Sequence, residues 1–362
     1  MIKRIRLIKF LDTLMGPWLI QLFPESPKKT SQHTDLKKIL VIRPGGMGDA
    51  LLLLPVLKHI SLKFRTCIDI LCEPRNQEIF LSVPFVHEVF SYQNIRSLIK
   101  VCTKQYNAVF DTEQSHFLST VLSGLIRSDL RIGFKTCSRQ KIYHQSVAYD
   151  HKTYEAEMFW QLFALAYPMY PCFRFDFPYF NPGPDSVFSK KLSSLKHKKF
   201  ICLFPGATIN ERHWPENRWA RVIDWIGTKN IIPVLIGGKK EKTICANIMA
   251  MCSTEKAVNM CARLSINETV QLFYNASILV STDSGILHLG VLCNIPTISL
   301  FGPGIAEKWA PEGKKHIVIN AGLCCSPCTR FGTTPPCPNH NECMKKITSD
   351  MVINGLRESG IF

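Results

Sequence analysis

Three short stretches place glycine beside acidic, hydroxyl or basic residues where an apolar strand gives way to a helix. The first, ILVIRPGGMGDALLLLPVL at residues 39–57, has glycines that permit a sharp turn and close approach to a ligand. It fits neither nucleotide fingerprint, because Leu51 stands where a third glycine is needed, and Asp49 and Ala50 replace the Lys-Ser/Thr of a Walker loop. The turn makes Asp49 a candidate for chemistry, with capping of the helix as the alternative.

The second stretch, FPGATINERHWPENRW at residues 204–219, predicts anion binding. Gly206 and Ala207 are small enough for a backbone amide to reach a phosphate. Thr208 adds a hydroxyl, and Arg212 adds a cation that can bind two oxygens at once.

The third stretch, VSTDSGILHLG at residues 280–290, opens another helix at Ser284 and Gly285, whose amides can face an anion. His288 lies three residues beyond Gly285 on the same helical face and can add a donor. Its alternative role is that of an ordinary core histidine.

Composition limits the classes of protein to consider. The chain has 362 residues, of which 46% are hydrophobic and 20% charged, which predicts a folded protein of two domains. Its net charge of +16 predicts an anionic partner, such as acidic lipid, a nucleotide, nucleic acid or an anionic polymer. Basic residues are dispersed and no nucleic-acid-binding signature occurs, so we expect no nucleic-acid partner.

The N-terminal segment, residues 1–23, is typical of an amphipathic helix lying on a membrane surface. Apolar residues recur every three or four positions at Ile5, Ile8, Leu11, Met15, Trp18 and Leu22. Lys3, Arg4, Arg6 and Lys9 supply charge for anionic headgroups. The alternative is a helix packed on the protein's own body. The sequence contains no run of about 18 apolar residues, so no membrane span is predicted.

Strand and helix patterns alternate along the rest of the chain, which predicts an α/β protein of two doubly wound, Rossmann-like domains facing a cleft. We expect an amphipathic segment and linker at residues 1–35, a first domain at 36–180 and a second at 181–362. The junction is placed at PMYPCFRFDFPYFNPGPD, where proline and aromatic residues interrupt the pattern.

The three stretches, in this order, resemble those of the family 9 glycosyltransferases, the ADP-heptose:lipopolysaccharide heptosyltransferases. STDSGILHLGVLCNIPTISLFGP, residues 281–303, carries the likeness most specifically. The resemblance implies a GT-B fold with an acceptor-binding first domain and a second domain that binds the nucleotide sugar.

The resemblance also implies roles for individual residues. Asp49 matches the proposed catalytic base, and the positions matching donor contacts are Thr208, Arg212, Glu241, Asp283, Ser284, Gly285 and His288. Ala207 stands where some relatives have a second threonine. An inverting transfer needs a base that takes the acceptor hydroxyl's proton while the diphosphate leaves from the opposite face, which suits Asp49.

The predicted function is transfer of a heptose or related sugar from an ADP-sugar to a lipopolysaccharide core or similar lipid-linked glycan. The chain contains no D-x-D pair that could hold Mg²⁺. We therefore expect metal-independent transfer, with no cofactor required for catalysis. Arg43, Arg131, Lys135 and Arg139 are candidate contacts of an anionic acceptor, with solvated surface as the alternative. We expect a cytoplasmic protein, peripheral on the inner membrane.

The C-terminal segment 324–343 holds five of the fifteen cysteines. Cys325 and Cys328 form a C-x-x-C pair, and Cys337 and Cys343 follow, which is a candidate structural zinc site. The alternative is a loop of reduced thiols.

Two other functions are compatible with the sequence. One is a transferase that uses another nucleotide sugar. The other is a non-catalytic protein that binds nucleotide sugars or polyanions, which the presence of Asp49 disfavours.

Overall fold

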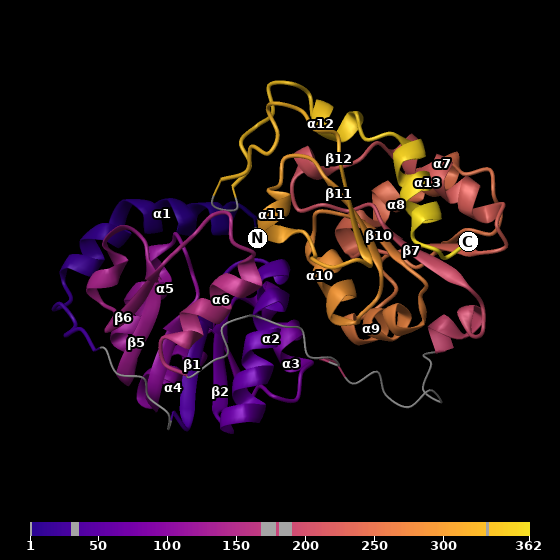
Figure 1. Ribbon diagram of the computed structural model, residues 1–362. Helices are drawn as coiled ribbons and strands as arrows, with labels where there is room; N and C mark the ends of the chain where they lie inside the picture. Colours follow the sequence, from indigo (N-terminus) through magenta and orange to yellow (C-terminus); the bar gives the residue numbers. More distant parts are fainter. Residues whose placement is uncertain (1, 30–35, 168–178, 181–189, 331–332) are drawn as a thin grey trace. The chain divides into compact units, whose positions relative to one another are not determined.

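The computed structural model describes residues 2–29, 36–167, 179–180, 190–330 and 333–362, and side chains from residue 11 onward. The chain divides into two compact units, Met1–Asp176 and Phe177–Phe362. Figure 1 labels most of their helices and strands. The predicted boundary at residue 180 stays a prediction, because segments on both sides of it lie outside the described residues.

Unit 1 is built on a six-stranded sheet in which every pairing is parallel, with the order β3-β2-β1-β4-β5-β6. Its central strands are buried apolar runs, as expected for a sheet covered on both faces. The strands are β1 (Lys38–Arg43), β2 (Cys67–Cys72), β3 (Glu88–Ser91), β4 (Gln105–Asp111), β5 (Arg127–Lys135) and β6 (Gln145–Ala148).

Helices cover both faces of this sheet. Val101 and Leu122, from α4 and α5, pack against one face, while α2 packs against α6. The helices are α1 (Ile2–Gln21), α2 (Met47–Phe64), α3 (Pro74–Leu81), α4 (Ile95–Thr103), α5 (Phe117–Leu125) and α6 (Glu155–Ala164), with a short 3-10 helix at Cys137–Lys141. α3 begins with Pro74 at a position where the missing amide costs nothing, and the side chain of Asn94 caps α4.

Unit 2 repeats the architecture with the strand order β12-β11-β10-β7-β8-β9, again parallel throughout. The strands are β7 (Phe200–Phe204), β8 (Ile232–Leu235), β9 (Val258–Asn259), β10 (Leu279–Thr282), β11 (Thr297–Phe301) and β12 (His316–Asn320). In both units the first and fourth strands are neighbours, and the chain runs outward from this pair in both directions. This switch point is where doubly wound sheets bind ligands.

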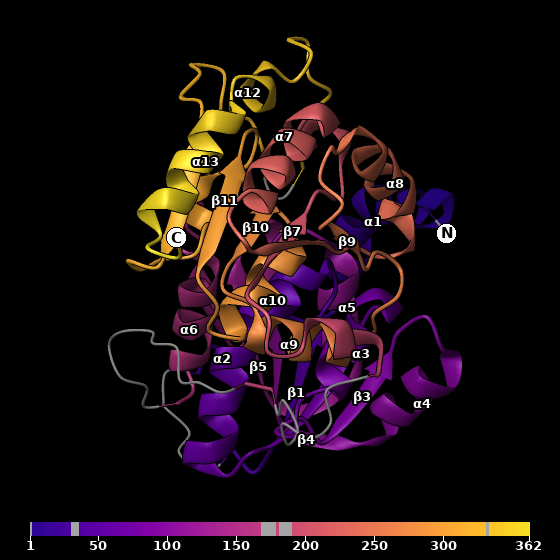
Figure 2. The same ribbon diagram turned by 90° about the vertical axis from the view of Figure 1, so that its right-hand side faces the viewer.

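One apolar cluster joins the sheet of unit 2 to α7, α8 and α13, which Figure 2 shows at the top of the view. α7 contributes Trp219, Val222, Ile223 and Ile226, whose spacing puts one helical face in the core. The helices are α7 (Glu216–Gly227), α8 (Lys242–Met251), α9 (Ile266–Asn275), α10 (Gly285–Leu292), α11 (Ala306–Trp309), α12 (Glu342–Lys345) and α13 (Ser349–Glu358), with 3-10 helices at Lys190–Leu195, Asn210–Arg212 and Lys239–Glu241.

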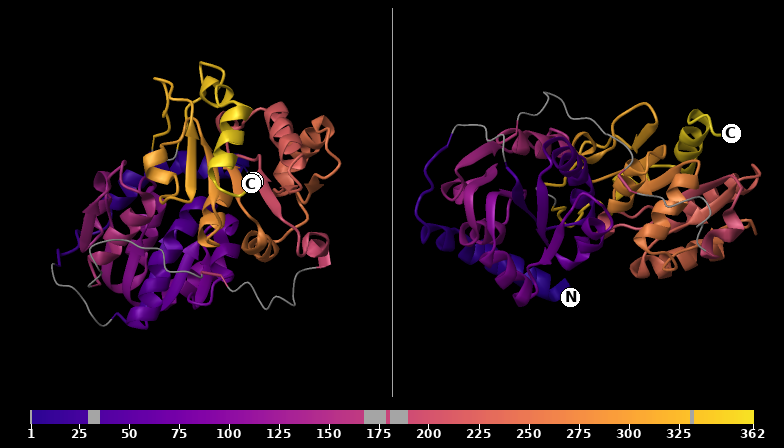
Figure 3. Two further views of the ribbon diagram at one scale, coloured as in Figure 1. Left: turned by 45° about the vertical axis from the view of Figure 1, so that its right-hand side comes forward. Right: turned by 90° about the horizontal axis from the view of Figure 1, so that it is seen from below.

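α1 packs on unit 1 along α5 and is the indigo helix in Figure 3. Asp12 accepts hydrogen bonds from the amides of Phe117 and Leu118 at the start of α5, at 2.9 and 2.5 Å. A side chain at Gly16 would collide with Phe117, and Ile20 is fully buried. The helix therefore does pack on the protein body, as the alternative interpretation expected.

The other face of α1 remains apolar and exposed. Its described part, with the residue that follows it, presents a stripe of side chains that are 36–80% exposed: Leu11, Leu14, Met15, Trp18, Leu19 and Leu22. The predicted stripe residues Ile5 and Ile8, and the basic side chains of Lys3, Arg4, Arg6 and Lys9, lie outside the described side chains. Within the described residues, no helix is long and apolar enough to cross a membrane.

Candidate active site

The turn after β1 carries Asp49 to the switch point of unit 1. α2 begins after Gly46, so Asp49 lies in the first turn and is not the capping residue. Gly45 has a φ of +105°, and a side chain there would come within 2.9 Å of the Arg43 guanidinium. The turn therefore requires glycine at this position. The side chain of Asp49 is 31% exposed, which leaves its carboxylate accessible to a substrate.

Arg43, the last residue of β1, is buried beneath this turn with 1% exposure. Its Nε donates to the carbonyl of Pro44 at 2.6 Å, and Nη1 donates to the carbonyl of Thr112 at 2.7 Å. Nη2 lies 3.4 Å from Asp49 Oδ2 and 3.9 Å from Glu113 Oε2. Burial alone would lower the pKa of Arg43, but Asp49 and Glu113 raise it above its ordinary value. Arg43 is thus a fixed cation between two carboxylates.

Glu113 follows β4, the neighbour of β1 at the switch point. Its Oε1 accepts from the amides of Gln114, Ser115 and His116, at 2.9–3.3 Å. Burial opposes ionisation, but Arg43 and other charges lower the pKa of Glu113 to about 2. Glu113 is therefore ionised at neutral pH and helps to hold Arg43 in place.

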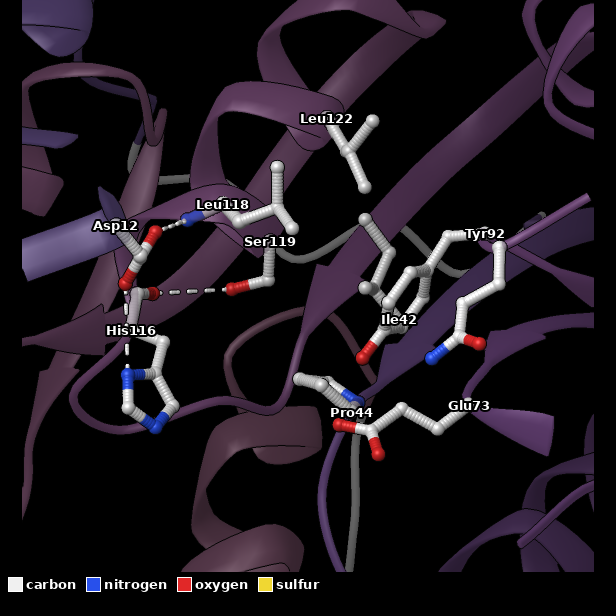
Figure 4. A pocket seen from close by; sticks show the side chains of 10 residues that line it. Asp12, Ile42, Pro44, Glu73, Tyr92, His116, Leu118, Ser119 and Leu122 are labelled. Atoms are coloured by element: carbon white, nitrogen blue, oxygen red, sulfur yellow. Dashed lines mark hydrogen bonds and ion pairs between the residues drawn. The ribbon is translucent and has the colours of Figure 1, made fainter. Parts of the chain in front are cut away.

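A mainly apolar pocket adjoins the turn at the carboxyl ends of β1, β2 and β3 (Figure 4). Glu73, Tyr92 and His116 supply polar groups to its lining. Glu73 Oε1 accepts from the amide of Gly45 at 3.1 Å, which ties the pocket wall to the turn that carries Asp49. These residues were not predicted from the sequence, although each lies just beyond a strand or at the start of a helix.

In unit 2, the loop after β7 and the loop after β8 meet around Glu241. The carboxylate of Glu241 accepts from the amide of Gly238 at 2.8 Å. A side chain at Gly206 would come within 2.4 Å of Glu241 Cγ, so glycine is needed for this contact. Thr208, two residues further on, is exposed.

Arg212 and Asp283 form an ion pair at the carboxyl ends of β7 and β10, the two strands of the switch point. Arg212 Nη1 lies 3.0 Å from Asp283 Oδ2, and the side chains are 16% and 5% exposed. A side chain at Gly304 would come within 2.1 Å of the same Asp283 oxygen. Asp283 thus orients the guanidinium from a closely packed position.

The N-terminus of α10 lies beside this pair. Ser284 is the capping residue, and its hydroxyl is 3.1 Å from that of Ser281. His288, in the first turns of α10, is 4% exposed. Burial and the nearby Arg212 lower the pKa of His288 to about 4, so its ring is neutral at pH 7.

Two buried nitrogens at this edge, Arg212 Nε and His288 Nδ1, have no hydrogen-bond partner among the described residues. Buried polar atoms are nearly always hydrogen-bonded, so such a pair indicates a place for a ligand. A helix N-terminus, an arginine and small residues are the groups that bind a diphosphate.

A family model described as glycosyltransferase family 9 (heptosyltransferase) matches residues 95–337, about two thirds of the chain. The chain belongs to glycosyltransferase family 9. The resemblance given by the three sequence stretches is thereby confirmed.

The chain is similar to several heptosyltransferases at low sequence identity. Lipooligosaccharide heptosyltransferase 2 of Haemophilus ducreyi is 24% identical over 309 residues, which cover 78% of this chain and 88% of that protein. Among solved structures, E. coli ADP-heptose LPS heptosyltransferase II has a TM-score of 0.73 at 19% identity, covering 88% of this chain and 97% of that one. E. coli heptosyltransferase WaaC with ADP-2-deoxy-2-fluoro heptose has a TM-score of 0.67 at 19% identity, covering 89% and 99%. These matches confirm the predicted GT-B fold.

The structure gathers the donor residues that the family likeness implied. Thr208, Arg212, Glu241, Asp283, Ser284, Gly285 and His288 all follow the carboxyl ends of β7, β8 or β10. Their roles toward a donor, and that of Asp49, stay predictions. Asp283 is held by Arg212.

Three of the basic residues predicted as acceptor contacts have partners inside unit 1, and their role toward an acceptor stays a prediction. The donors of Arg43 are used inside the protein, and Arg131 donates to the carbonyls of Ser123 and Ile126 at the end of α5. Arg139 is fully buried and pairs with Asp111 at 3.0 Å. These side chains hold unit 1 together, which the sequence could not show because their partners are distant along the chain. Lys135 is exposed and stays a candidate.

The four C-terminal cysteines share one neighbourhood. Burial raises the pKa of Cys343, and the nearby thiols of Cys337, Cys328 and Cys325 raise it further. Their sulfurs are nevertheless more widely spaced than in a closed site, since none of them belongs to a described group of three or more metal-ligating atoms within 4.8 Å of one another. Structural zinc in this segment stays a prediction.

Proposed function

We propose that this chain transfers a heptose or related sugar from an ADP-sugar to a lipopolysaccharide core or similar lipid-linked glycan, with inversion at the anomeric carbon. Family 9 membership supports the reaction class. The donor identity is supported by the distant heptosyltransferase relatives, one of which was solved with an ADP-heptose analogue.

One observation carries the proposal for the donor: Arg212 Nε and His288 Nδ1 are buried without a described partner beside the N-terminus of α10. A diphosphate placed there would accept hydrogen bonds from both groups. It would also lie at the positive end of the α10 helix dipole. Glu241, two strands away from β10, is suited to accept hydrogen bonds from a ribose.

Asp49 is the proposed base. The acceptor hydroxyl gives its proton to the Asp49 carboxylate as its oxygen bonds to the anomeric carbon, and the bond from that carbon to the diphosphate breaks. Arg212 and the amides at α10 then stabilise the negative charge that develops on ADP. Arg43 positions Asp49 from beneath and does not contact the substrate.

We propose that the transfer proceeds without a metal ion. The fixed cation at Arg212 and the helix N-terminus supply positive charge where the leaving diphosphate needs it. The donor stretches contain no paired carboxylates of the D-x-D kind.

The proposed acceptor is anionic and anchored in a membrane, and the protein is proposed to act on the cytoplasmic face of the inner membrane. The exposed apolar stripe of α1 supports this, since Trp18 is 77% and Leu22 is 80% exposed. Residues 1–38 also carry eight lysines or arginines against three acids. A helix of this kind lies in a membrane interface by its apolar side while its basic residues meet anionic headgroups.

The direct test is to incubate the protein with a panel of nucleotide sugars and acceptor lipids, and to identify products by mass spectrometry. We expect the acceptor mass to rise by one heptose with ADP-heptose in the presence of a chelator. Transfer from another nucleotide sugar alone would contradict the donor assignment. Binding of ADP-heptose without transfer to any acceptor would identify a non-catalytic binding protein.

A further inference from the structure

A cluster of metal-ligating side chains lies at the amino-terminal ends of β2 and β3, the end of the unit 1 sheet opposite to Asp49. Cys67 and Asp69 are two residues apart on β2, so their side chains point to the same face. His87 immediately precedes β3, and its amide donates to the carbonyl of Ile68 at 2.8 Å, which brings its ring to the same place. This is the sole group of three or more such side chains within 4.8 Å that the described residues contain.

The separations suit a tetrahedral ion. One ligating atom each from Cys67, Asp69 and His87 lies within 4.8 Å of the other two. Bond lengths of about 2.0–2.3 Å to zinc place ligands roughly 3.3–3.7 Å apart, so only small side-chain movements are needed. Thiolate, imidazole and carboxylate together are a ligand set typical of zinc.

The two oxygens of Asp69 have different surroundings. Oδ2 accepts from Lys104 Nζ and from the hydroxyl of Tyr106, both at 3.0 Å. Oδ1 faces His87 Nδ1 at 2.9 Å. Oδ1 can exchange that contact for a metal ion while Oδ2 keeps its partners, which is how outer-shell groups hold a ligating carboxylate.

Charge and access also permit a cation. Asp69 is fully buried, whereas the His87 side chain is 60% exposed, so an ion can enter from solvent and keep a water as fourth ligand. Lys104 opposes a cation, but it is also paired with Glu88. The thiol of Cys67 would release its proton to solvent as the sulfur–metal bond forms.

We propose that Cys67, Asp69 and His87 form a zinc site that fastens the edge strand β3 to β2. The site is independent of the proposed transferase function, and it is separate from the cysteines of segment 324–343. Bound zinc would stabilise unit 1 by adding a further link between two strands that already meet through backbone hydrogen bonds, the His87–Asp69 pair and Lys104, which pairs with both Asp69 and Glu88.

The test is a titration of the chelator-treated full-length protein with Co²⁺ alone, read by thiolate-to-cobalt absorption and by equilibrium dialysis. We expect wild type to take up one equivalent more than Cys67→Ser and one more than His87→Gln. Cys102→Ser, a half-buried cysteine on α4, is the matched control and should keep wild-type uptake. Cysteines of segment 324–343 contribute equally to all these proteins, so they cancel in the comparison.

Thermal unfolding with and without Zn²⁺ separates metal binding from misfolding. Without metal, His87→Gln should unfold near the wild-type temperature, because its side chain is largely exposed, and zinc should raise the midpoint of wild type but not of the variant. Equal cobalt uptake by wild type and both variants would overturn the site. If Cys67→Ser lost one equivalent of cobalt and His87→Gln kept wild-type uptake, the three-residue site would be overturned.

Discussion

The two units share one strand order but place different charged groups at the same topological position. At the switch point of unit 1, a buried arginine lies between the carboxylates of Asp49 and Glu113. At the switch point of unit 2, Arg212 and a helix N-terminus lie beside a neutral histidine and one paired aspartate. The first edge is suited to accept a proton and the second to hold an anion. The fold supplies the position, and the residues after the first and fourth strands decide the chemistry.

Removing Arg43 should have the largest effect on unit 1. Arg43→Gln leaves Asp49 and Glu113 without their shared cation in a largely buried setting, so we expect a loss of about 3–5 kcal/mol in the free energy of unfolding. Urea denaturation followed by circular dichroism measures this loss. Arg221→Gln, which breaks an exposed ion pair with Asp350, should cost under about 1 kcal/mol. Similar losses for the two variants would contradict the role given to Arg43.

In unit 2, His288 should make stability depend on pH. Its pKa is lowered from 6.5 to about 4 by burial and by Arg212, so in acid the unfolded chain binds a proton that the folded protein does not. Stability contributed by the neutral ring is therefore present above pH 6.5 and is lost as the pH falls toward 4. Between pH 7.5 and pH 5 the loss should be about 2 kcal/mol.

The variant His288→Gln should lose less stability than wild type over the same pH interval. Unfolding curves at the two pH values give the comparison directly. An identical pH dependence in wild type and variant would show that His288 does not titrate as described.

Arg212 tests the anion-binding character of the same edge. Arg212→Gln should weaken ADP binding by roughly tenfold to a hundredfold, because it removes charge-assisted hydrogen bonds to the diphosphate. Arg212→Lys keeps the charge but loses the paired donors, so its ADP affinity should lie between those of wild type and Arg212→Gln. Calorimetric titration with ADP measures the dissociation constants of wild type and both variants. An unchanged dissociation constant for Arg212→Gln would show that the donor does not bind at this edge.

The smallest expected effect concerns α1, an element of unit 1 without a described counterpart in unit 2. Replacing Trp18 and Leu22 by serine should reduce sedimentation with anionic liposomes several-fold, because these exposed side chains would enter the interface. The matched control replaces Leu62 and Leu81, which are 63% and 64% exposed on α2 and α3. Equal liposome binding by the two double variants would show that the stripe does not contact the membrane.

Local patterns were sufficient to predict most of the fold. Apolar runs separated by helical periodicity gave the order of elements, and glycine-containing turns marked the carboxyl ends of β1, β7 and β10. The edge strands β6 and β12 are harder to recognise from sequence, because a strand such as His316–Asn320 is only partly buried and its apolar run is short.

The site was less predictable, because its decisive contacts join residues far apart in sequence. Arg43 looked like a surface cation until burial placed it against the carbonyl of Thr112. Gly304 could not be recognised as the residue that makes room for Asp283. A periodic pattern reports which face of an element is apolar, but not which polar group of another element will meet it.

We propose that Asp49 removes the acceptor proton while residues of unit 2 hold the donor. The most direct measurement compares donor affinity and turnover in Asp49→Asn, which keeps the size of the side chain and removes its basicity. We expect ADP-sugar affinity close to that of wild type and a fall in kcat of roughly a thousandfold or more. Asp350→Asn, an exposed aspartate on α13, should leave both unchanged. An Asp49→Asn enzyme that keeps most of its turnover would contradict the account.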